Sequence, residues 1–173
     1  MTDVFIIGKG PAGISAALYT ARAGLSTVVT GMSSGSLGKA EKIENYYGFA
    51  EPVSGQELFE SGIRGAERLG VTVLDEEVFS VSWDGNFQIV TDRGQHEAEA
   101  LIIAAGSVRK APDIPGLKKF EGAGVSYCAV CDAFFHRGND VVVIGNGAYA
   151  VSEAEHLAGV VKSVTILTNG REM

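Results

Sequence analysis

The chain has 173 residues, of which 46% are hydrophobic and 20% charged, so it can bury a core and lacks the composition of a disordered protein. Its net charge of −7 makes nucleic acids and anionic membranes poor partners, and we expect neither. The longest apolar run, Ala100 to Ala105, is far shorter than the roughly 20 residues of a membrane-spanning helix, and the N-terminus lacks the basic region of a secretory signal. We therefore expect a cytoplasmic protein without a membrane segment.

The first thirty residues predict a strand, a tight turn, a helix and a second strand. Residues 3–8 (DVFIIG) form a short β-branched run that is typical of a buried parallel strand. Pro11 fits the first turn of a helix, and the alanine-rich stretch 12–23 stops before Gly24, a common helix-terminating residue. Residues 26–30 (STVVT) form the second strand, which completes a βαβ unit.

The turn between this first strand and helix, residues 8–13, has the sequence GKGPAG. In this pattern Gly8 allows a tight turn, Gly10 lets the backbone approach a pyrophosphate, and Gly13 lets the helix pack closely on the strand. The helix N-terminus would supply N–H groups to the anion. The alternative is a tight turn without a ligand. The acidic ribose ligand usual after the second strand is absent, because residues 30–32 read TGM, so backbone or water would have to hold a ribose.

The middle of the chain predicts one more helix and a series of short strands. Residues 33–38 read as a glycine-spaced loop, and Ser54 begins a helix in which Glu57 completes a capping box before Gly70 ends it. The strands that follow are expected at residues 71–75, 78–83, 87–91 and 101–106.

Residues 111–116 (APDIPG) mark a domain boundary, and a second strand, glycine turn, helix and strand follow at 140–145, 145–150, 148–158 and 163–168. This turn reads GNGAYA, with Gly145 and Gly147 as candidate nucleotide-binding residues. Tyr149 is bulky where a pyrophosphate needs room, so a turn that no longer binds a nucleotide is the alternative. The strand ends in TNGR, whose one arginine would hold a 2′-phosphate poorly.

The two cysteines, Cys128 and Cys131, are separated by two residues and are followed by Asp132. This spacing suits a reversible disulfide, and the aspartate can exchange a proton with a thiolate. Two alternatives remain: half of a zinc site with His136 as a further ligand, or two inert thiols in the core. Three aromatic residues are expected in the core: Trp83, Phe134 and Phe135.

Together the segments GKGPAG, TGM, ENYYGF, AAGS and CAVCDAFFHRGNDVVVIG resemble, in this order, the low-molecular-weight thioredoxin reductases. The resemblance covers essentially the whole chain. It implies an α/β fold with two Rossmann-like dinucleotide-binding domains, in which a pyridine-nucleotide domain that carries the dithiol is inserted into an FAD domain. Both domains are incomplete here, at residues 1–112 and 113–173, so the chain resembles the N-terminal portion of a longer, homodimeric protein.

The resemblance also implies roles for individual residues. The FAD pyrophosphate would be held by Gly8, Gly10, Pro11, Ala12 and Gly13, and the flavin nucleotide would lie along Gly31, Met32, Asn45 and Gly106. Cys131 would face the flavin, Cys128 would attack the disulfide of a thioredoxin-like partner, and Asp132 would be the acid. No metal is implied.

The departures from the family pattern concern the electron donor. Its usual pair of arginines is replaced by Thr168-Asn169-Gly170, and its second glycine turn is altered, which leaves NADPH or NADH uncertain. Related flavoproteins that lack these features take electrons from ferredoxin, and others pass electrons from dithiols to oxygen. The sequence therefore predicts an FAD-dependent disulfide reductase, with a dithiol oxidase or a non-catalytic nucleotide-binding fragment as alternatives.

Overall fold

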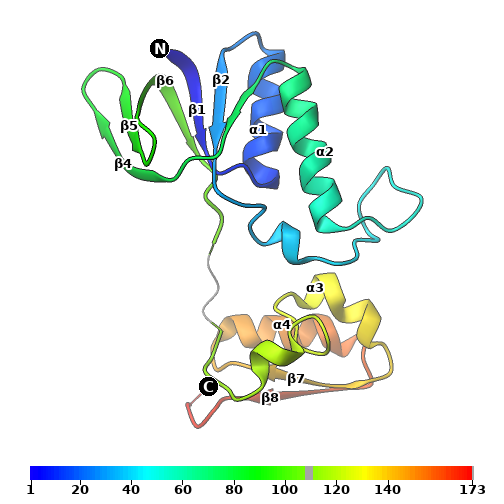
Figure 1. Cartoon of the computed structure of the whole chain (residues 1–173). Coiled ribbons are helices and arrows are strands. Elements are labelled where there is room, and N and C mark those ends of the chain that lie inside the picture. Colours follow the sequence, from blue (N-terminus) through cyan, green and yellow to red (C-terminus); the bar gives the residue numbers. More distant parts are fainter. Residues whose placement is uncertain (108–110, 173) are drawn as a thin grey trace. The chain divides into compact units, whose positions relative to one another are not determined.

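The computed structural model describes residues 1–107 and 111–172. The chain divides into two compact units, Met1–Lys110 and Ala111–Met173. Each unit combines parallel strands with helices, which confirms the α/β class predicted from the sequence (Figure 1). None of the helices in the described ranges has the length and apolar character needed to cross a bilayer.

The first unit is built on a six-stranded sheet in the order β3-β2-β1-β6-β5-β4. Strands β1, β2, β3 and β6 are parallel, whereas β5 and β4 continue the sheet as an antiparallel hairpin. The register pairs Ile7 of β1 with Thr30 of β2 and with Ile103 of β6, so the carboxyl ends of three strands meet at one edge. The strand bounds are β1 (Thr2–Ile7), β2 (Thr27–Thr30), β3 (Thr72–Leu74), β4 (Val78–Trp83), β5 (Phe87–Thr91) and β6 (Gln95–Ile103).

Two helices, α1 (Pro11–Arg22) and α2 (Gly55–Arg68), lie side by side on one face of this sheet, and the short η1 (Leu37–Lys39) precedes α2 (Figure 1). The predicted capping box of α2 is confirmed. Ser54 Oγ accepts from the Glu57 N–H at 3.1 Å, and the Glu57 carboxylate accepts from the Ser54 N–H at 3.2 Å. Such caps contribute about 1 kcal/mol to helix stability.

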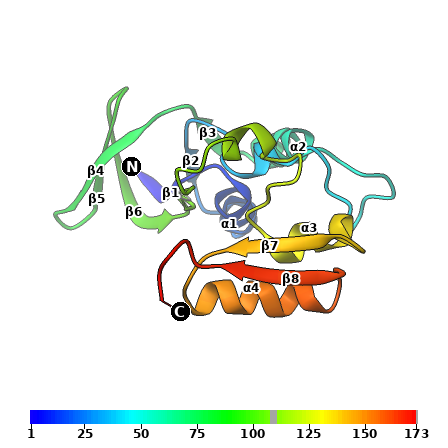
Figure 2. The same cartoon turned by 90° about the horizontal axis from the view of Figure 1, so that it is seen from below.

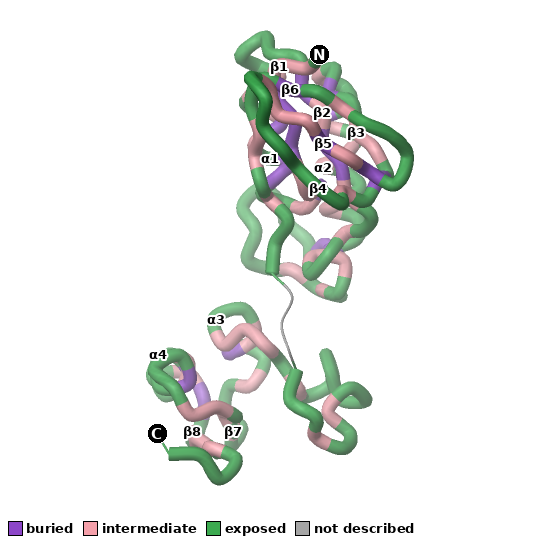
Figure 3. Tube along the Cα trace, turned by 90° about the vertical axis from the view of Figure 1, so that its left-hand side faces the viewer, coloured by how far each residue is buried: buried purple, intermediate pink, exposed green. Residues whose placement is uncertain are grey.

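The core follows the alternation of β1, whose successive side chains point to opposite faces of the sheet. Val4 and Ile6 pack with Ile14 and Ala17 of α1 on the helical face, whereas Phe5 packs with Ile89 and Ala98 on the other face. Figure 3 shows these buried stretches concentrated on the central strands of the first unit. Full burial of Phe5 or Ile6 contributes about 1.5–3 kcal/mol each.

The expected burial of Trp83 is wrong. Its side chain is 60% exposed and meets the ring of Phe87 edge-on, with ring centroids 4.7 Å apart. The physical reason is position: β4 is the last strand of the sheet, so among the described residues no further strand pairs with its outer edge.

The second unit is smaller and pairs two parallel strands, β7 (Asp140–Ile144) and β8 (Ser163–Leu167), with α4 (Ala148–Ala158) connecting them. Figure 2 shows α4 running along this strand pair. Leu157 of α4 and Val161 form the core with Ala133. The unit also contains three short turns of helix, which the sequence analysis did not predict: η2 (Leu117–Phe120), α3 (Ala129–Asp132) and η3 (Ala133–His136).

A buried polar network joins three strands of the first unit through Glu76. Its carboxylate accepts from Thr91 Oγ1 at 2.7 Å and lies 2.7 Å from His96 Nε2, and its backbone carbonyl accepts from Thr30 Oγ1 at 2.8 Å. The hydrogen bonds from His96 and then Thr91 lower the pKa of Glu76 below its ordinary value of 4.5. A carboxyl group whose pKa is lowered by folding stabilises the fold at pH values above its pKa in the unfolded chain. This stabilisation is lost as the pH falls through the pKa in the folded state.

We predict that Glu76→Gln lowers the free energy of unfolding by about 1–3 kcal/mol at pH 7, because an amide oxygen accepts from Thr91 and His96 more weakly than a buried carboxylate does. Below pH 4.5 the gap between this variant and the parent should shrink, since the parent's carboxyl then takes up a proton. Urea unfolding between pH 3 and pH 7 measures both effects. The neighbouring Glu77→Gln, at an exposed side chain, is the control, and an equal loss in both variants would contradict the prediction.

Candidate functional site

The β1–α1 turn is shaped by two close backbone approaches. Gly8 has a φ of +109°, and its N–H donates to the Thr30 carbonyl at 2.7 Å. A Cβ at Gly8 would lie 2.2 Å from the Ala104 carbonyl oxygen, and a Cβ at Gly13 would lie 1.7 Å from the Gly8 carbonyl oxygen. These two glycines are therefore required by the protein's own packing, whether or not a ligand is present.

The protein's own packing does not require a glycine at position 10. A Cβ there would meet nothing within 4 Å, and its φ of −70° is accessible to any residue. It is the N-cap of α1, with Pro11 and Ala12 exposed in the first turn. Open space before the first N–H groups of a helix fits a phosphate group, because these groups lack partners within the helix.

The other expected nucleotide ligands in this unit mostly gather at the same sheet edge. Gly31 follows β2 and lies so close to the loop that a Cβ would be 3.0 Å from the Lys9 nitrogen. Met32 is exposed beside it, and Gly106 follows β6 with a φ of +72°. Asn45 lies on the exposed segment between η1 and α2.

The sequence analysis assigned no role to Lys9, the second residue of the glycine loop. Its side chain is buried, forms an ion pair with Asp75 just beyond β3, and places Nζ 5.9 Å from the ring centroid of Phe59 on α2. This ion pair links the glycine loop, which follows β1, to the segment that follows β3. The place of Lys9 in a glycine-rich turn did not indicate this contact, because Asp75 lies 66 positions further along the chain.

The second glycine loop, between β7 and α4, differs from the first. A Cβ at Gly145 would lie 2.8 Å from the Ala150 Cβ, whereas one at Gly147 would meet nothing within 4 Å. Asn146 Nδ2 donates to the Glu172 carbonyl at 3.2 Å, and Tyr149 is exposed. A cavity of about 410 Å³ opens at the ends of these strands, and uncharged residues line it: Ile114, Ile144, Ile166, Leu167, Thr168, Asn169 and Gly170.

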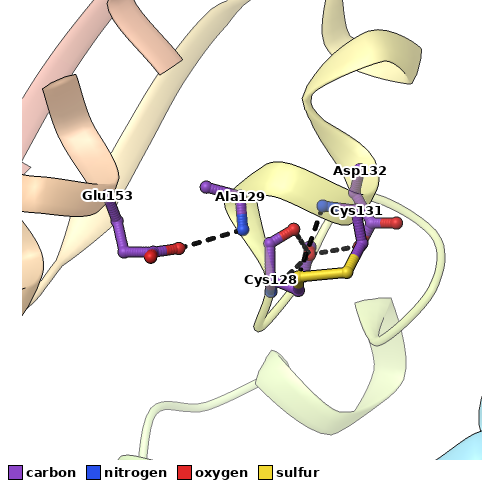
Figure 4. Close-up of a disulfide and its surroundings, with 6 residues drawn as sticks. Cys128, Ala129, Cys131, Asp132 and Glu153 are labelled. Atoms are coloured by element: carbon purple, nitrogen blue, oxygen red, sulfur yellow. Dashed lines mark hydrogen bonds between the residues drawn. A yellow bond between two sulfur atoms is a disulfide. The ribbon is translucent and has the colours of Figure 1, made fainter. Parts of the chain in front are cut away.

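Cys128 and Cys131 form a disulfide, with their Cα atoms 5.3 Å apart (Figure 4). Cys128 is the N-cap of α3, and its sulfur accepts from the Cys131 N–H at 3.3 Å. Cys131 is exposed, whereas Cys128 is half-buried. The described residues contain no group of three or more His, Cys, Asp or Glu side chains that could hold a metal ion.

A serine missed by the sequence analysis links the expected acid to the disulfide. Ser126 Oγ donates to the Asp132 carboxylate and accepts from the Cys128 N–H at 3.1 Å. Asp132 is therefore held next to the cysteine pair by one hydroxyl group. The serine two residues before the first cysteine was the available signal.

A second carboxylate reaches the same segment from α4. Glu153 Oε2 accepts from the Ala129 N–H at 3.0 Å, directly after Cys128 (Figure 4). The helical spacing of α4 gave no indication of this contact, because α3 was not predicted.

The expected burial of Phe134 and Phe135 is also wrong. Their side chains are 65% and 48% exposed, and Val130, between the cysteines, is 68% exposed. The short η3 directs them away from the small core of the second unit, whose η3 member is Ala133. Three exposed apolar side chains therefore lie close to the cysteines in the sequence.

Comparison with known proteins supports the sequence resemblance. Residues 2–173 match the family model of the pyridine nucleotide-disulphide oxidoreductases. The chain belongs to this family. It is 40% identical over 170 residues to a thioredoxin reductase of Streptomyces coelicolor and 42% identical over 169 residues to one of Bacillus subtilis, covering 95% of this chain and 53% of each relative.

Solved structures of family members agree with this assignment. The thioredoxin reductase of Streptococcus pyogenes superposes with a TM-score of 0.91 at 35% identity, over 100% of this chain and 57% of that chain. The atypical thioredoxin reductase TRi of Desulfovibrio vulgaris Hildenborough is 42% identical, with a TM-score of 0.59, over 99% of this chain and 58% of that chain. The chain thus spans little more than half the length of these relatives.

We predict that Gly13→Ala lowers the free energy of unfolding by about 1–3 kcal/mol, because its Cβ would collide with the Gly8 carbonyl. Gly10→Ala, which adds the same methyl group in open space, should cost less than about 1 kcal/mol. Urea unfolding without added cofactor measures both, and equal losses would contradict this reading of the loop.

Proposed function

We propose that the chain is the N-terminal part of an FAD-dependent disulfide reductase that passes electrons through Cys128 and Cys131 to a thioredoxin-like protein. The observation that carries this proposal is the partly exposed disulfide held beside a carboxylate, in a chain that also has an open glycine loop for a nucleotide. The names of its relatives, which are thioredoxin reductases, support the same activity.

The first unit supplies residues suited to hold FAD. In this proposal residues 1–112 are part of the FAD domain, and residues 113–173 begin the nucleotide-type domain that carries the dithiol. The open space at Gly10 fits the pyrophosphate, while Gly31, Met32, Asn45 and Gly106 would lie along the rest of the cofactor. When bound, FAD supplies the electron pair that reduces the disulfide.

The dithiol then acts by thiol–disulfide exchange. The Cys128 thiolate attacks one sulfur of the partner's disulfide, and the other partner sulfur leaves as a thiolate. The Cys131 thiolate next attacks the Cys128 sulfur, which restores the disulfide and releases the second partner thiolate. Two electrons and two protons reach the partner, and Asp132, held by Ser126, is placed to exchange a proton with a thiolate.

The surface around the disulfide favours a protein substrate. Val130, Phe134 and Phe135 expose apolar side chains next to the cysteines. A protein partner can cover such a patch, whereas a small soluble disulfide would bury little of it.

The second unit favours an electron donor other than NADPH. A 2′-phosphate is usually held by arginine, yet the cavity at the ends of β7 and β8 is lined by uncharged residues. Asn146 and Tyr149 also replace small residues of the family's glycine turn. A ferredoxin donor would not need this pocket, and we propose it as the alternative to a nicotinamide cofactor.

We predict that the reduced Cys131→Ser variant, in which Cys128 is the one remaining thiol, attacks an activated thioredoxin disulfide at least tenfold faster than Cys128→Ser does. The reason is that Cys128 at the N-cap of α3 receives the residue 131 N–H, which stabilises its thiolate. The substrate is a thioredoxin with one active-site cysteine, activated as its 2-nitro-5-thiobenzoate disulfide. Release of the yellow thiolate gives the rate, and a faster Cys128→Ser variant would reverse the assignment.

We predict that NADPH reduces the FAD-loaded protein poorly. Each missing charge-assisted hydrogen bond weakens binding by about 1.5–3 kcal/mol, so the loss of two corresponds to roughly two to four powers of ten. Stopped-flow absorbance with NADPH, NADH and reduced ferredoxin measures flavin reduction. Thr168→Arg, which adds one arginine at this cavity, should tighten NADPH binding about tenfold. Flavin bleaching within milliseconds at micromolar NADPH would contradict the prediction.

A further inference from the structure

The contact between Glu153 and the cysteine segment has no part in the proposed mechanism. The residue after an N-cap has a backbone N–H without a partner inside its helix, and such N–H groups stabilise a nearby negative charge. Here the Ala129 N–H is already occupied by the Glu153 carboxylate at 3.0 Å. The Cys128 sulfur keeps the Cys131 N–H, at 3.3 Å.

We propose that Glu153 is a positioning residue that fixes the cysteine segment on α4 and places a negative charge beside Cys128 that disfavours its thiolate. With Glu153 in place, a smaller fraction of the reduced Cys128 is thiolate at neutral pH than without this charge, which slows its exchange with disulfides. This regulation of the dithiol rests on the proposed function for its biological meaning, although the chemistry itself requires neither FAD nor a partner.

The charges around α3 make Glu153 the residue to test. Besides the cysteines, the ionisable side chains on α3 and on the elements packed against it, or next to it in the chain, are Tyr127, Asp132, His136, Arg137, Tyr149, Glu153, Glu155 and His156. Among these, Asp132 is engaged with Ser126, and Arg137 lies 5.5 Å from the Phe134 ring centroid. Glu153 is bonded to the backbone directly next to Cys128, and its place on α4 keeps it there.

The substitution Glu153→Gln separates the two parts of the proposal. The amide oxygen of glutamine can accept the same Ala129 N–H, so the segment stays anchored while the negative charge is lost. Glu155→Gln, two residues along the same helix at an exposed side chain, changes the net charge equally and serves as the matched control.

The experiment uses the Cys131→Ser background, in which Cys128 is the remaining cysteine of the chain. The rate of alkylation by iodoacetamide is measured from pH 5 to pH 10. Removal of one nearby charge should lower the midpoint of the Glu153→Gln profile by about 0.5–1 pH unit, which corresponds to a roughly three- to tenfold faster reaction at pH 7. The Glu155→Gln profile should match that of the background protein.

An unchanged midpoint, a midpoint that rises, or an equal shift in both variants overturns the proposal. If Glu153→Gln does not fold, the ¹³C signal of the Glu153 carboxyl group is followed in the background protein, because two coupled charges respond to each other. That signal should move with the Cys128 midpoint, and a signal that does not move also overturns the proposal. Failure of thioredoxin reduction would leave these thiol measurements unaffected, so the two hypotheses fail separately.

Discussion

The close approach of the β1–α1 turn to two neighbouring strands is the constraint on which the first unit depends. Gly8 fits between the Thr30 carbonyl, which accepts its N–H, and the Ala104 carbonyl, which leaves no room for a side chain. This contact brings the carboxyl ends of β1, β2 and β6 to one edge and starts α1 there. Gly10 lies between the two tightly packed glycines, Gly8 and Gly13, yet a Cβ at Gly10 would meet nothing within 4 Å.

The second unit positions its chemistry in a different way, because polar side chains add to the packing of Ala129 on the small core. Ser126 links Cys128 to Asp132, and Glu153 of α4 accepts from the Ala129 N–H. Val130, Phe134 and Phe135, which lie close to the cysteines in the sequence, are exposed. The same segment therefore presents the exposed Cys131 together with exposed apolar side chains.

Most of the fold could be predicted from the sequence because it follows local rules. The α4 bounds of 148–158 and the Ser54–Glu57 capping box were both correct, since periodicity and caps are short-range signals. The exposure of Trp83 and Phe134 was not predictable in this way, because it depends on which strand lies last in the sheet and how small the second core is. The contacts of Lys9 and Glu153 join residues 66 and 24 positions apart, a separation that no sequence motif encodes.

The strand pair β7–β8 determines where local unfolding of the chain should begin. On one side it packs against α4, while Val142, Ile144 and Leu167 on the other side are about half exposed. Two strands with one helix bury little area, so their amide protons should exchange with solvent sooner than those of β1 and β2. Local unfolding would then begin in the unit that carries the disulfide. Reduction of the disulfide would favour this local unfolding further, because it removes a covalent link within the segment.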